Sequence, residues 1–368
     1  MKHPLVVGID DAIADLEAFD SILDARSPGE FAEDRLPGAT NTPVLDDAQR
    51  ALVGTIYRQD SPFAARRLGA ALVSRNIADI LEQRLCDKPR EWRPLVYCWR
   101  GGNRSGALST VLARIGWRTA ILDGGDREFR RRVVSDLAAW PAQLWLHVVA
   151  GRTGCGKSLI LTQLRKLGAQ VLDLEALARH RGSVLGLLPQ TIQPTQKAFE
   201  SGLWQAIRGF DRSRPVFVES ESRRVGQCHL PEALIAAMRA APGTRIEMKL
   251  EDRATLLLRE YRHFTEQPAE LFSRLERLVP LHGRRVVSVW RALAESDRWE
   301  EFVVALLEAH YDPAYDRSTT SNYAEIEHGR ALEVAGIDEA HLQATARQLL
   351  ESVKPPTDEA STDEALHD

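Results

Sequence analysis

The chain has 368 residues, of which 44% are hydrophobic and 27% charged, and its formal net charge is -4 at pH 7. This length exceeds what one hydrophobic core usually covers, so it predicts two globular domains. No apolar run reaches the roughly 20 residues that cross a bilayer, the first residues lack a signal peptide's apolar core, and the cysteines are too few for a disulfide framework. We therefore expect a cytoplasmic protein with free thiols and no membrane contact.

The N-terminal part alternates strands and helices. Helical periodicity runs through residues 62–85 and 105–115, and residues 36–43 read as loop and turn. This alternation predicts a parallel α/β sheet with its functional loop at the C-terminal end of a strand. We expect this domain to span residues 1–137. Its predicted strands are 21–24, 94–97 and 119–122.

A second alternation follows and predicts another parallel α/β domain. A helix is expected at 158–167, and residues 255–311 have a helical pattern. We expect this domain, with its helical extension, to span residues 138–352, followed by a disordered acidic tail at 353–368. Its predicted strands are 143–150, 170–173, 215–219 and 246–250.

One cysteine lies in a glycine- and arginine-rich loop, residues 98–105, which reads Cys-Trp-Arg-Gly-Gly-Asn-Arg-Ser. The thiolate is the reactive form of cysteine, and a helix N-terminus stabilises it, with Arg100 and Arg104 adding positive charge. Gly101 and Gly102 let the backbone curl around sulfur or selenium. A buried structural cysteine is the alternative. As a candidate catalytic residue, Cys98 suits persulfide transfer and phosphate-monoester hydrolysis equally.

The second loop, residues 151–158, reads Gly-Arg-Thr-Gly-Cys-Gly-Lys-Ser and matches the P-loop pattern GxxxxGK[ST] between a predicted strand and a predicted helix. In such a loop the backbone N–H groups surround phosphate oxygens, Lys157 neutralises charge and Ser158 can hold Mg²⁺. The candidate phosphate-binding residues are Gly151, Arg152, Thr153, Gly154, Cys155, Gly156, Lys157 and Ser158.

A P-loop that binds a nucleoside triphosphate needs an acid at the end of a neighbouring strand. Glu219, Glu221 and Asp173 fit that place, and capping or pairing with Arg223 and Arg224 is their alternative role. Base-binding motifs of the GTPase type are absent from the sequence, so the loop alone does not establish a nucleotide. The sequence has no metal-ligand spacing either, and we expect Mg²⁺ to bind only together with a phosphate group held by the P-loop.

Four ordered segments of the N-terminal part resemble the signatures of a rhodanese domain. They are 23–31, 36–41, 97–105 and 122–125. The resemblance implies that Cys98 carries sulfur or selenium.

The two domains together resemble the tRNA 2-selenouridine synthase family, over nearly the whole chain to about residue 350. Beyond the two loops, the similar segments are 173–175, 180–183, 193–201, 218–226 and 311–315. The chain departs from the family at Asn103 and at 126–129, away from the thiol and the phosphate cradle. Residues that the resemblance places in support of the site are Asp173, Arg181, Glu219, Glu221 and Arg223.

What the family implies is a two-step modification of the wobble uridine. The P-loop domain uses geranyl diphosphate to alkylate the 2-thio group of 2-thiouridine in the anticodon stem-loop of a tRNA. Selenium from selenophosphate then displaces the geranylated sulfur, and Cys98 handles the chalcogen. A selenophosphate-producing enzyme is an implied partner.

Two further expectations follow if tRNA and a geranyl chain are the substrates. Arginines should contact tRNA phosphates. An apolar pocket should lie beside the P-loop, although core packing is the favoured role of each residue named for it. The candidate tRNA contacts are Arg130, Arg131, Arg224, Arg259 and Arg262, and the candidate pocket residues are Phe199, Leu203, Trp204, Tyr261 and Phe264.

Two other functions remain open at this point. One is a P-loop kinase or ATPase fused to a sulfurtransferase, and the other is a non-catalytic tRNA-binding or chalcogen-sensing module. The intact P-loop disfavours the sensor, because a sensor has no need of a phosphate cradle.

Overall fold

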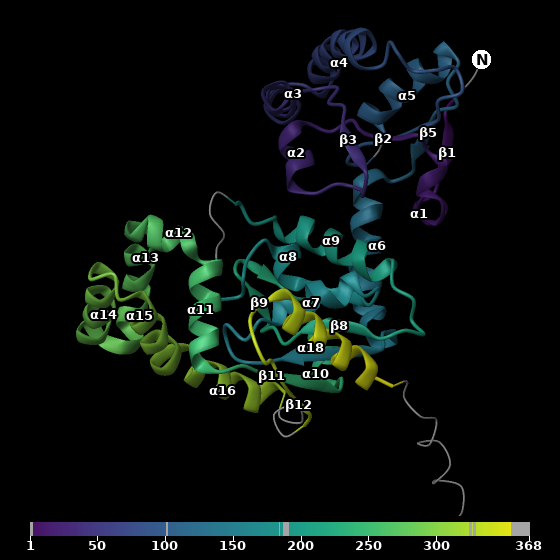
Figure 1. Ribbon diagram of the computed structural model, residues 1–368. Helices are drawn as coiled ribbons and strands as arrows, with labels where there is room; N and C mark the ends of the chain where they lie inside the picture. Colours follow the sequence, from purple (N-terminus) through teal and green to yellow (C-terminus); the bar gives the residue numbers. More distant parts are fainter. Residues whose placement is uncertain are drawn as a thin grey trace, which may run out of the picture. The chain divides into compact units, whose positions relative to one another are not determined.

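The computed structural model describes residues 3–100, 102–183, 185–186, 191–323, 326 and 329–354. The chain forms two compact units, which Figure 1 shows in the colours of the sequence. Unit 1 comprises Met1–Leu137 with Pro194–Gln205, and unit 2 comprises Ala138–Gln193 with Ala206–Asp368. None of the helices in the described stretches is long and apolar enough to cross a membrane.

Unit 1 is built on a five-stranded parallel sheet with the strand order β1-β5-β4-β2-β3. The central strand β4 is buried throughout, as expected for a parallel strand covered on both faces. The predicted parallel α/β class is therefore confirmed. The strands are β1 (Leu5–Val7), β2 (Ser21–Asp24), β3 (Ala39–Asn41), β4 (Pro94–Tyr97) and β5 (Ala120–Leu122).

One local prediction for unit 1 was wrong. Residues 36–43 were expected to be loop and turn, but they contain β3, whose backbone pairs with β2 at the edge of the sheet. The short strand β1 at the opposite edge, which pairs with β5, was not predicted at all.

Helices pack around this sheet; α5 follows β4 after the cysteine loop, and α6 follows β5 after a short turn. Local sequence explains several helix starts. Asp46 and the Gln49 side chain form a capping box at α3, and Ser61 caps α4 with Pro62 at its first position. The helices are α1 (Ile9–Ala14), the 3₁₀ helix η1 (Leu16–Ala18), α2 (Pro28–Glu33), α3 (Asp47–Gln59), α4 (Pro62–Arg84), α5 (Asn103–Ile115) and α6 (Gly125–Ala139).

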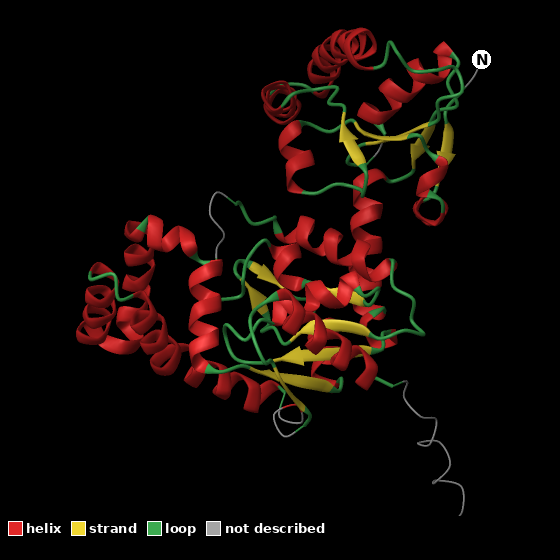
Figure 2. Cartoon of the chain, viewed as in Figure 1, coloured by secondary structure: helices red, strands yellow, loops and turns green. Residues whose placement is uncertain are grey.

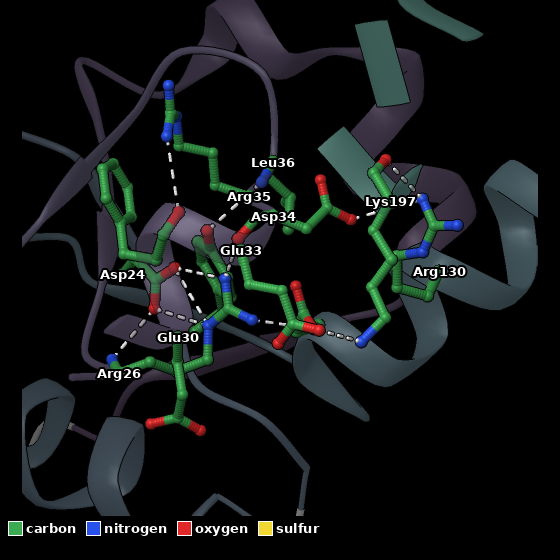
Figure 3. Close-up of polar contacts among 12 residues, drawn as sticks. Asp24, Arg26, Glu30, Glu33, Asp34, Arg35, Leu36, Arg130 and Lys197 are labelled. Atoms are coloured by element: carbon green, nitrogen blue, oxygen red, sulfur yellow. Dashed lines mark hydrogen bonds and ion pairs between the residues drawn. The ribbon is translucent and has the colours of Figure 1, made fainter. Parts of the chain in front are cut away.

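A segment distant in sequence completes unit 1. Helix α9 (Gln196–Arg208) belongs to this unit as far as Gln205. From the sequence we expected this helix to be part of the P-loop domain. Figure 3 shows Arg130 of α6 and Lys197 of α9 beside Glu33 and Asp34. The Arg130 guanidinium lies 3.2 Å from an Asp34 carboxylate oxygen, and Lys197 Nζ lies 2.7 Å from Glu33 Oε1.

Apolar packing holds the same segment. Trp204 is fully buried, its ring meets Phe129 edge to face at 5.6 Å between centroids, and its indole N–H donates to Asp136 at 2.8 Å. Ion pairs and packing with residues far away in sequence thus assign Pro194–Gln205 to unit 1, which local sequence patterns do not reveal.

Unit 2 contains a second five-stranded parallel sheet, with the order β12-β11-β6-β8-β7. Figure 2 shows helices around its strands. The predicted strand 246–250 is shifted: β11 begins earlier and ends at Glu247, because Leu250 already opens α11. The elements are η2 (Pro141–Gln143), β6 (Leu146–Ala150), α7 (Lys157–Lys166), β7 (Gln170–Leu172), α8 (Leu174–Ala178), β8 (Val216–Glu219), the hairpin β9 (Arg224–Val225) and β10 (Cys228–His229), α10 (Glu232–Ala240), β11 (Gly243–Glu247), β12 (Ala331–Glu333) and α18 (Glu339–Ser352).

A group of helices between β11 and β12 forms its own hydrophobic cluster, which includes Trp290, Phe302 and Leu306. The predicted helical stretch 255–311 is confirmed, and it starts earlier, at Leu250. Residues 355–368 of the expected tail lie outside the described residues. The helices are α11 (Leu250–Glu260), α12 (Arg262–Glu266), α13 (Pro268–Leu275), η3 (Glu276–Leu278), α14 (Val279–Glu295), α15 (Trp299–Leu306), the π-helix η4 (Leu307–Tyr311) and α16 (Asp312–Asn322).

Candidate functional site

The thiol of Cys98 lies at the C-terminal end of β4, just before α5. Its side chain is buried, and the Ser105 hydroxyl in the first turn of α5 donates a hydrogen bond to Cys98 Sγ at 3.1 Å. A hydroxyl donor and a helix N-terminus both favour the anionic form of a thiol. Gly102 precedes α5 in the left-handed region, and Gly101 lies outside the described residues.

The loop rests on the start of α6. The N–H of Asp126 donates to the Cys98 carbonyl at 2.8 Å, and the N–H of Arg127 donates to the Trp99 carbonyl at 3.0 Å. A Cβ on Gly125 would lie 2.1 Å from the Cys98 carbonyl oxygen, so only glycine fits there. This close approach gives a physical reason for the Asp-Gly-Gly segment that the sequence shares with rhodanese domains.

The two arginines of the loop have different surroundings. Arg104 is paired with Glu30, with its Nη1 at 2.5 Å and its Nη2 at 3.1 Å from the carboxylate oxygens. Burial opposes ionisation of Glu30, but the hydrogen bond and charge of Arg104 outweigh it and lower the pKa of Glu30 to about 2. Arg100 is exposed to solvent. Glu30, which sequence reasoning did not select, therefore balances much of the Arg104 charge.

The P-loop follows β6 and leads into α7, as its pattern predicts. Gly151 has φ +150°, and a Cβ there would lie 2.5 Å from the Ile246 carbonyl oxygen of the neighbouring strand β11. Gly156 precedes Lys157, the first residue of α7, so the backbone N–H groups of this turn face outward at a helix N-terminus. The arrangement is an anion-binding cradle.

Lys157 reaches back over this cradle. Its Nζ donates to the Gly151 carbonyl at 2.5 Å and lies 5.9 Å from the Tyr315 ring centroid, while the Gly151 N–H donates to the Tyr315 hydroxyl at 2.7 Å. Burial disfavours the ammonium, but nearby groups, among them Cys155, Tyr315 and Glu175, outweigh burial and raise the pKa of Lys157. The charge that a diphosphate needs is therefore in place.

Acidic residues adjoin the last position of the loop. Ser158 Oγ donates to Glu175 at 2.9 Å, and the Glu175 N–H donates to Glu219 Oε1 at 2.9 Å. Burial, together with the charge of Glu175, raises the pKa of Glu221 to about 7, and burial raises that of Glu219 well above its usual value. Glu175 was not among the predicted site residues, although it lies in a segment quoted for the family resemblance.

The remaining supporting residues have identifiable partners. Asp173 caps α8 by accepting a hydrogen bond from the Ala176 N–H, and Arg223 pairs with Glu232 at 3.4 Å. The Arg181 guanidinium lies 4.8 Å from the Tyr261 ring centroid. Asp173 and Arg223 thus have local structural roles, and Arg181 contacts the helical part.

The donor set allows Mg²⁺ beside the P-loop in one way only. No group of three or more His, Cys, Asp or Glu side chains that could hold a metal ion occurs within the described residues. Mg²⁺ is commonly held by one or two carboxylates, substrate phosphates and water. The Ser158 hydroxyl with Glu175 fits this mode, which requires a bound diphosphate.

An apolar cavity and a polar cavity border the P-loop within the described part of unit 2. The apolar cavity of about 60 Å³ touches the loop at Thr153 and is lined mainly by the helical part, including Tyr261, Phe264, Trp299 and Phe302, together with Ser183 and Leu185. The larger, more polar cavity of about 540 Å³ touches the loop at Arg152 and Cys155.

The five residues named for the apolar pocket divide between the two roles considered for them, pocket lining and core packing. Tyr261 and Phe264 line the apolar cavity. Phe199, Leu203 and Trp204 are instead buried in the α9 segment of unit 1. The sequence does not show that α9 packs in unit 1.

The candidate tRNA-contacting arginines differ in exposure. Arg131, Arg224, Arg259 and Arg262 are exposed. Arg130 is largely buried, with its guanidinium paired to Asp34 and Glu200, so its geometry favours a structural role in unit 1.

Comparisons with known proteins point to one family. Residues 145–277 match the family described as "tRNA 2-selenouridine synthase AAA domain", and residues 9–132 match the rhodanese-like domain family. A tRNA 2-selenouridine synthase of Alcanivorax borkumensis is 33% identical over 80% of this chain and 88% of its own length. Proteins of the same name from Marinobacter nauticus (31%, 83% and 90%) and Nitrosomonas europaea (35%, 71% and 68%) are also similar.

Solved structures add less. The chain resembles the N-terminal domain of a putative ATP/GTP binding protein from Clostridium difficile 630 at 32% identity, with a TM-score of 0.31, over 35% of this chain and 98% of that one. The fold assignment therefore depends on the sheet topologies described above.

Proposed function

The chain belongs to the tRNA 2-selenouridine synthase family, and from this premise we propose that it modifies tRNA by converting 2-thiouridine at the wobble position to 2-selenouridine through S-geranyl-2-thiouridine. The observation that carries the proposal is the apolar cavity beside the P-loop. This cavity places aromatic and aliphatic side chains beside Thr153, where they can hold a geranyl chain whose diphosphate is bound by the P-loop.

In the first step, the P-loop holds the diphosphate of geranyl diphosphate. Sulfur of 2-thiouridine attacks the first carbon of the geranyl group, the carbon–oxygen bond breaks and diphosphate leaves with the bonding electrons. Lys157 and the backbone N–H groups stabilise the charge that develops on the leaving group. Mg²⁺ held by Ser158, Glu175 and the diphosphate would supply further charge at this point.

The apolar cavity is smaller than a ten-carbon chain. A volume of about 60 Å³ holds roughly four to six groups the size of a water molecule. The first isoprene unit fits such a space, and the second requires lining side chains such as Tyr261 or Phe264 to move. We therefore expect the cavity to widen when geranyl diphosphate binds.

The second step uses the cysteine loop. Selenium of selenophosphate replaces the geranylated sulfur, which leaves as the geranyl thiolate, and water releases the phosphate. Cys98 acts in this step, and the Ser105 hydroxyl in the first turn of α5 donates a hydrogen bond to its sulfur. The partners are the tRNA anticodon stem-loop and an enzyme that supplies selenophosphate, and the exposed arginines Arg131, Arg224, Arg259 and Arg262 are the candidate phosphate contacts.

Two substitutions separate the steps. Lys157→Ala should abolish geranylation of a 2-thiouridine-containing tRNA, because the leaving group loses its counter-charge. Cys98→Ala should leave geranylation intact and block selenium incorporation. Lys166→Ala, which removes an exposed lysine at the end of the same helix α7, is the matched control and should do neither.

The same variant, together with two activity assays, distinguishes this function from the alternative enzyme, a P-loop ATPase fused to a sulfurtransferase. Normal geranylation by the Lys157→Ala protein would refute the assignment of the P-loop. ATP hydrolysis without tRNA, together with sulfur transfer from thiosulfate to cyanide, would instead identify a P-loop ATPase fused to a sulfurtransferase.

A further inference from the structure

The polar cavity of unit 2 lies at the point where the chain reverses direction across the sheet. After β6 the chain proceeds to β7 and β8 on one side, and after β8 it returns to β11 and β12 on the other. In open α/β sheets, ligands bind outside the carboxyl ends of the strands at such a switch point. The cavity is lined from both flanking strands, by Arg152 and Cys155 after β6 and by Ile246, Glu247 and Met248 at the end of β11.

Its size and lining suit a nucleotide better than a diphosphate alone. The volume of about 540 Å³ falls within the range of about 300–1,000 Å³ typical of ligand sites. Ile246, Met248 and the Tyr315 ring offer apolar and aromatic surface, and Arg245 and Asp316 offer polar groups. Flipped or unstacked bases are recognised by this combination of stacking and hydrogen bonds.

The charged groups of the cavity can exchange partners at low cost. Arg245 pairs with Glu247, and Arg152 pairs with Asp316, each at 2.8 Å. Both pairs are partly exposed, and exposed ion pairs contribute little to stability. A phosphate of an RNA backbone can therefore take either guanidinium from its carboxylate.

We propose, on the basis of the function given above, that this cavity receives the wobble nucleotide during the geranyl transfer. The apolar cavity touches the P-loop at Thr153, and the polar cavity touches it at Arg152 and Cys155. A nucleotide in the polar cavity and a geranyl chain in the apolar cavity therefore both border the P-loop, which holds the diphosphate. This placement brings the thiocarbonyl sulfur toward the carbon that it attacks.

The chemistry explains the carboxylates of this cavity. When sulfur of a neutral 2-thiouracil ring forms the bond to carbon, the ring must lose its N3 proton, while the electrons of the broken carbon–oxygen bond leave with the diphosphate. The Glu247 and Asp316 carboxylates in the cavity wall are proton acceptors for this step.

Photocrosslinking locates the nucleotide without requiring turnover. An anticodon stem-loop RNA carrying 4-thiouridine at the wobble position is irradiated with the full-length protein in the presence of inorganic pyrophosphate, and the crosslinked peptides are identified by mass spectrometry. The expected crosslinks fall on residues 245–248 or 315–319. Met248→Trp, which fills the cavity, should remove at least about nine tenths of this crosslink while the protein still binds pyrophosphate.

A second variant tests the phosphate contact. Arg245→Ala should lower the slope of RNA affinity against salt by about 1, as expected for one lost phosphate contact. Arg298→Ala is the matched control, since it removes an exposed, paired arginine from the helical part, and it should leave the slope of RNA affinity against salt unchanged.

The outcomes separate this inference from the function on which it rests. Crosslinks confined to other peptides, or an undiminished crosslink in Met248→Trp, overturn the nucleotide site alone if pyrophosphate binds and geranyl transfer proceeds. Failure of the wild-type protein to bind pyrophosphate and to transfer a geranyl group overturns both.

Discussion

The ion pair between Glu30 and Arg104 allows a quantitative test of how the cysteine loop is supported. Glu30 lies in the capping box of α2, and Arg104 lies in the first turn of α5, directly after the loop. We predict that Glu30→Gln destabilises α2 and the start of α5 at neutral pH. The substitution keeps the size of the side chain and removes its charge.

The pKa of Glu30 sets the magnitude. It falls from 4.5 to about 2, although burial acts in the opposite direction, because Arg104 donates hydrogen bonds and supplies positive charge. Since each pKa unit corresponds to about 1.36 kcal/mol, the ceiling is about 3.4 kcal/mol. The side chains retain some solvent contact, so we expect about 1–3 kcal/mol at pH 7.

The effect should depend on pH in one direction. A carboxylate whose pKa is lower in the folded state stabilises the folded protein fully at pH values above its unfolded-state pKa, here 4.5. This contribution to stability is lost as the pH falls toward the folded-state pKa of about 2. The maximum contribution of the Glu30 charge to the free energy of unfolding is therefore about 2 kcal/mol smaller at pH 3 than at pH 7.

Hydrogen exchange resolved by peptide measures this locally in the full-length protein. Exchange of peptides from α2 and α5 is compared for wild type and Glu30→Gln at pH 7 and pH 3, each corrected for its intrinsic rate. Glu33→Gln, on the same helix but paired at the surface with Lys197, is the control, with an expected effect below about 1 kcal/mol. Equal destabilisation by Glu30→Gln at both pH values would refute the ion-pair reasoning.

Three further predictions concern the packing and the two loops. Trp204→Ala should destabilise unit 1 by about 3–5 kcal/mol, because it removes a fully buried ring and the indole N–H that donates to Asp136. A loss below about 1 kcal/mol in chemical denaturation would contradict this. Ser105→Ala should slow selenium incorporation by about tenfold or more, because it removes the hydrogen bond to the Cys98 sulfur. Geranylation of the same tRNA should stay unchanged, and equal losses in both assays would contradict this prediction. Geranyl diphosphate, but not pyrophosphate, should change the tryptophan fluorescence, and Trp299→Phe should abolish the change; a persisting signal would place the geranyl chain elsewhere.

The sequence predicted the parts of the fold that depend on local patterns. β2 and β4 coincide with their predicted ranges because buried parallel strands are short continuous apolar runs. The P-loop and the cysteine loop were located because both are contiguous motifs. β3 was missed because three residues after a turn carry little pattern, and its pairing with β2 decides its conformation.

The site residues that were missed depend on contacts between distant segments. Glu175 gains its role because its N–H binds Glu219 and its carboxylate accepts from Ser158. Glu30 gains its role through Arg104, and Trp204 packs on Phe129 rather than in a pocket. A sequence alone shows no such pairings, since each joins residues from separate elements.

The central claim is that one chain geranylates and then selenates the wobble uridine. The most direct test is mass spectrometry of wobble nucleosides in tRNA from cells that lack this protein, complemented with the wild-type, Lys157→Ala or Cys98→Ala chain. We predict 2-selenouridine with wild type, unmodified 2-thiouridine with Lys157→Ala, and accumulated S-geranyl-2-thiouridine with Cys98→Ala. Normal 2-selenouridine in cells that carry either variant, or in cells without the protein, would contradict the account.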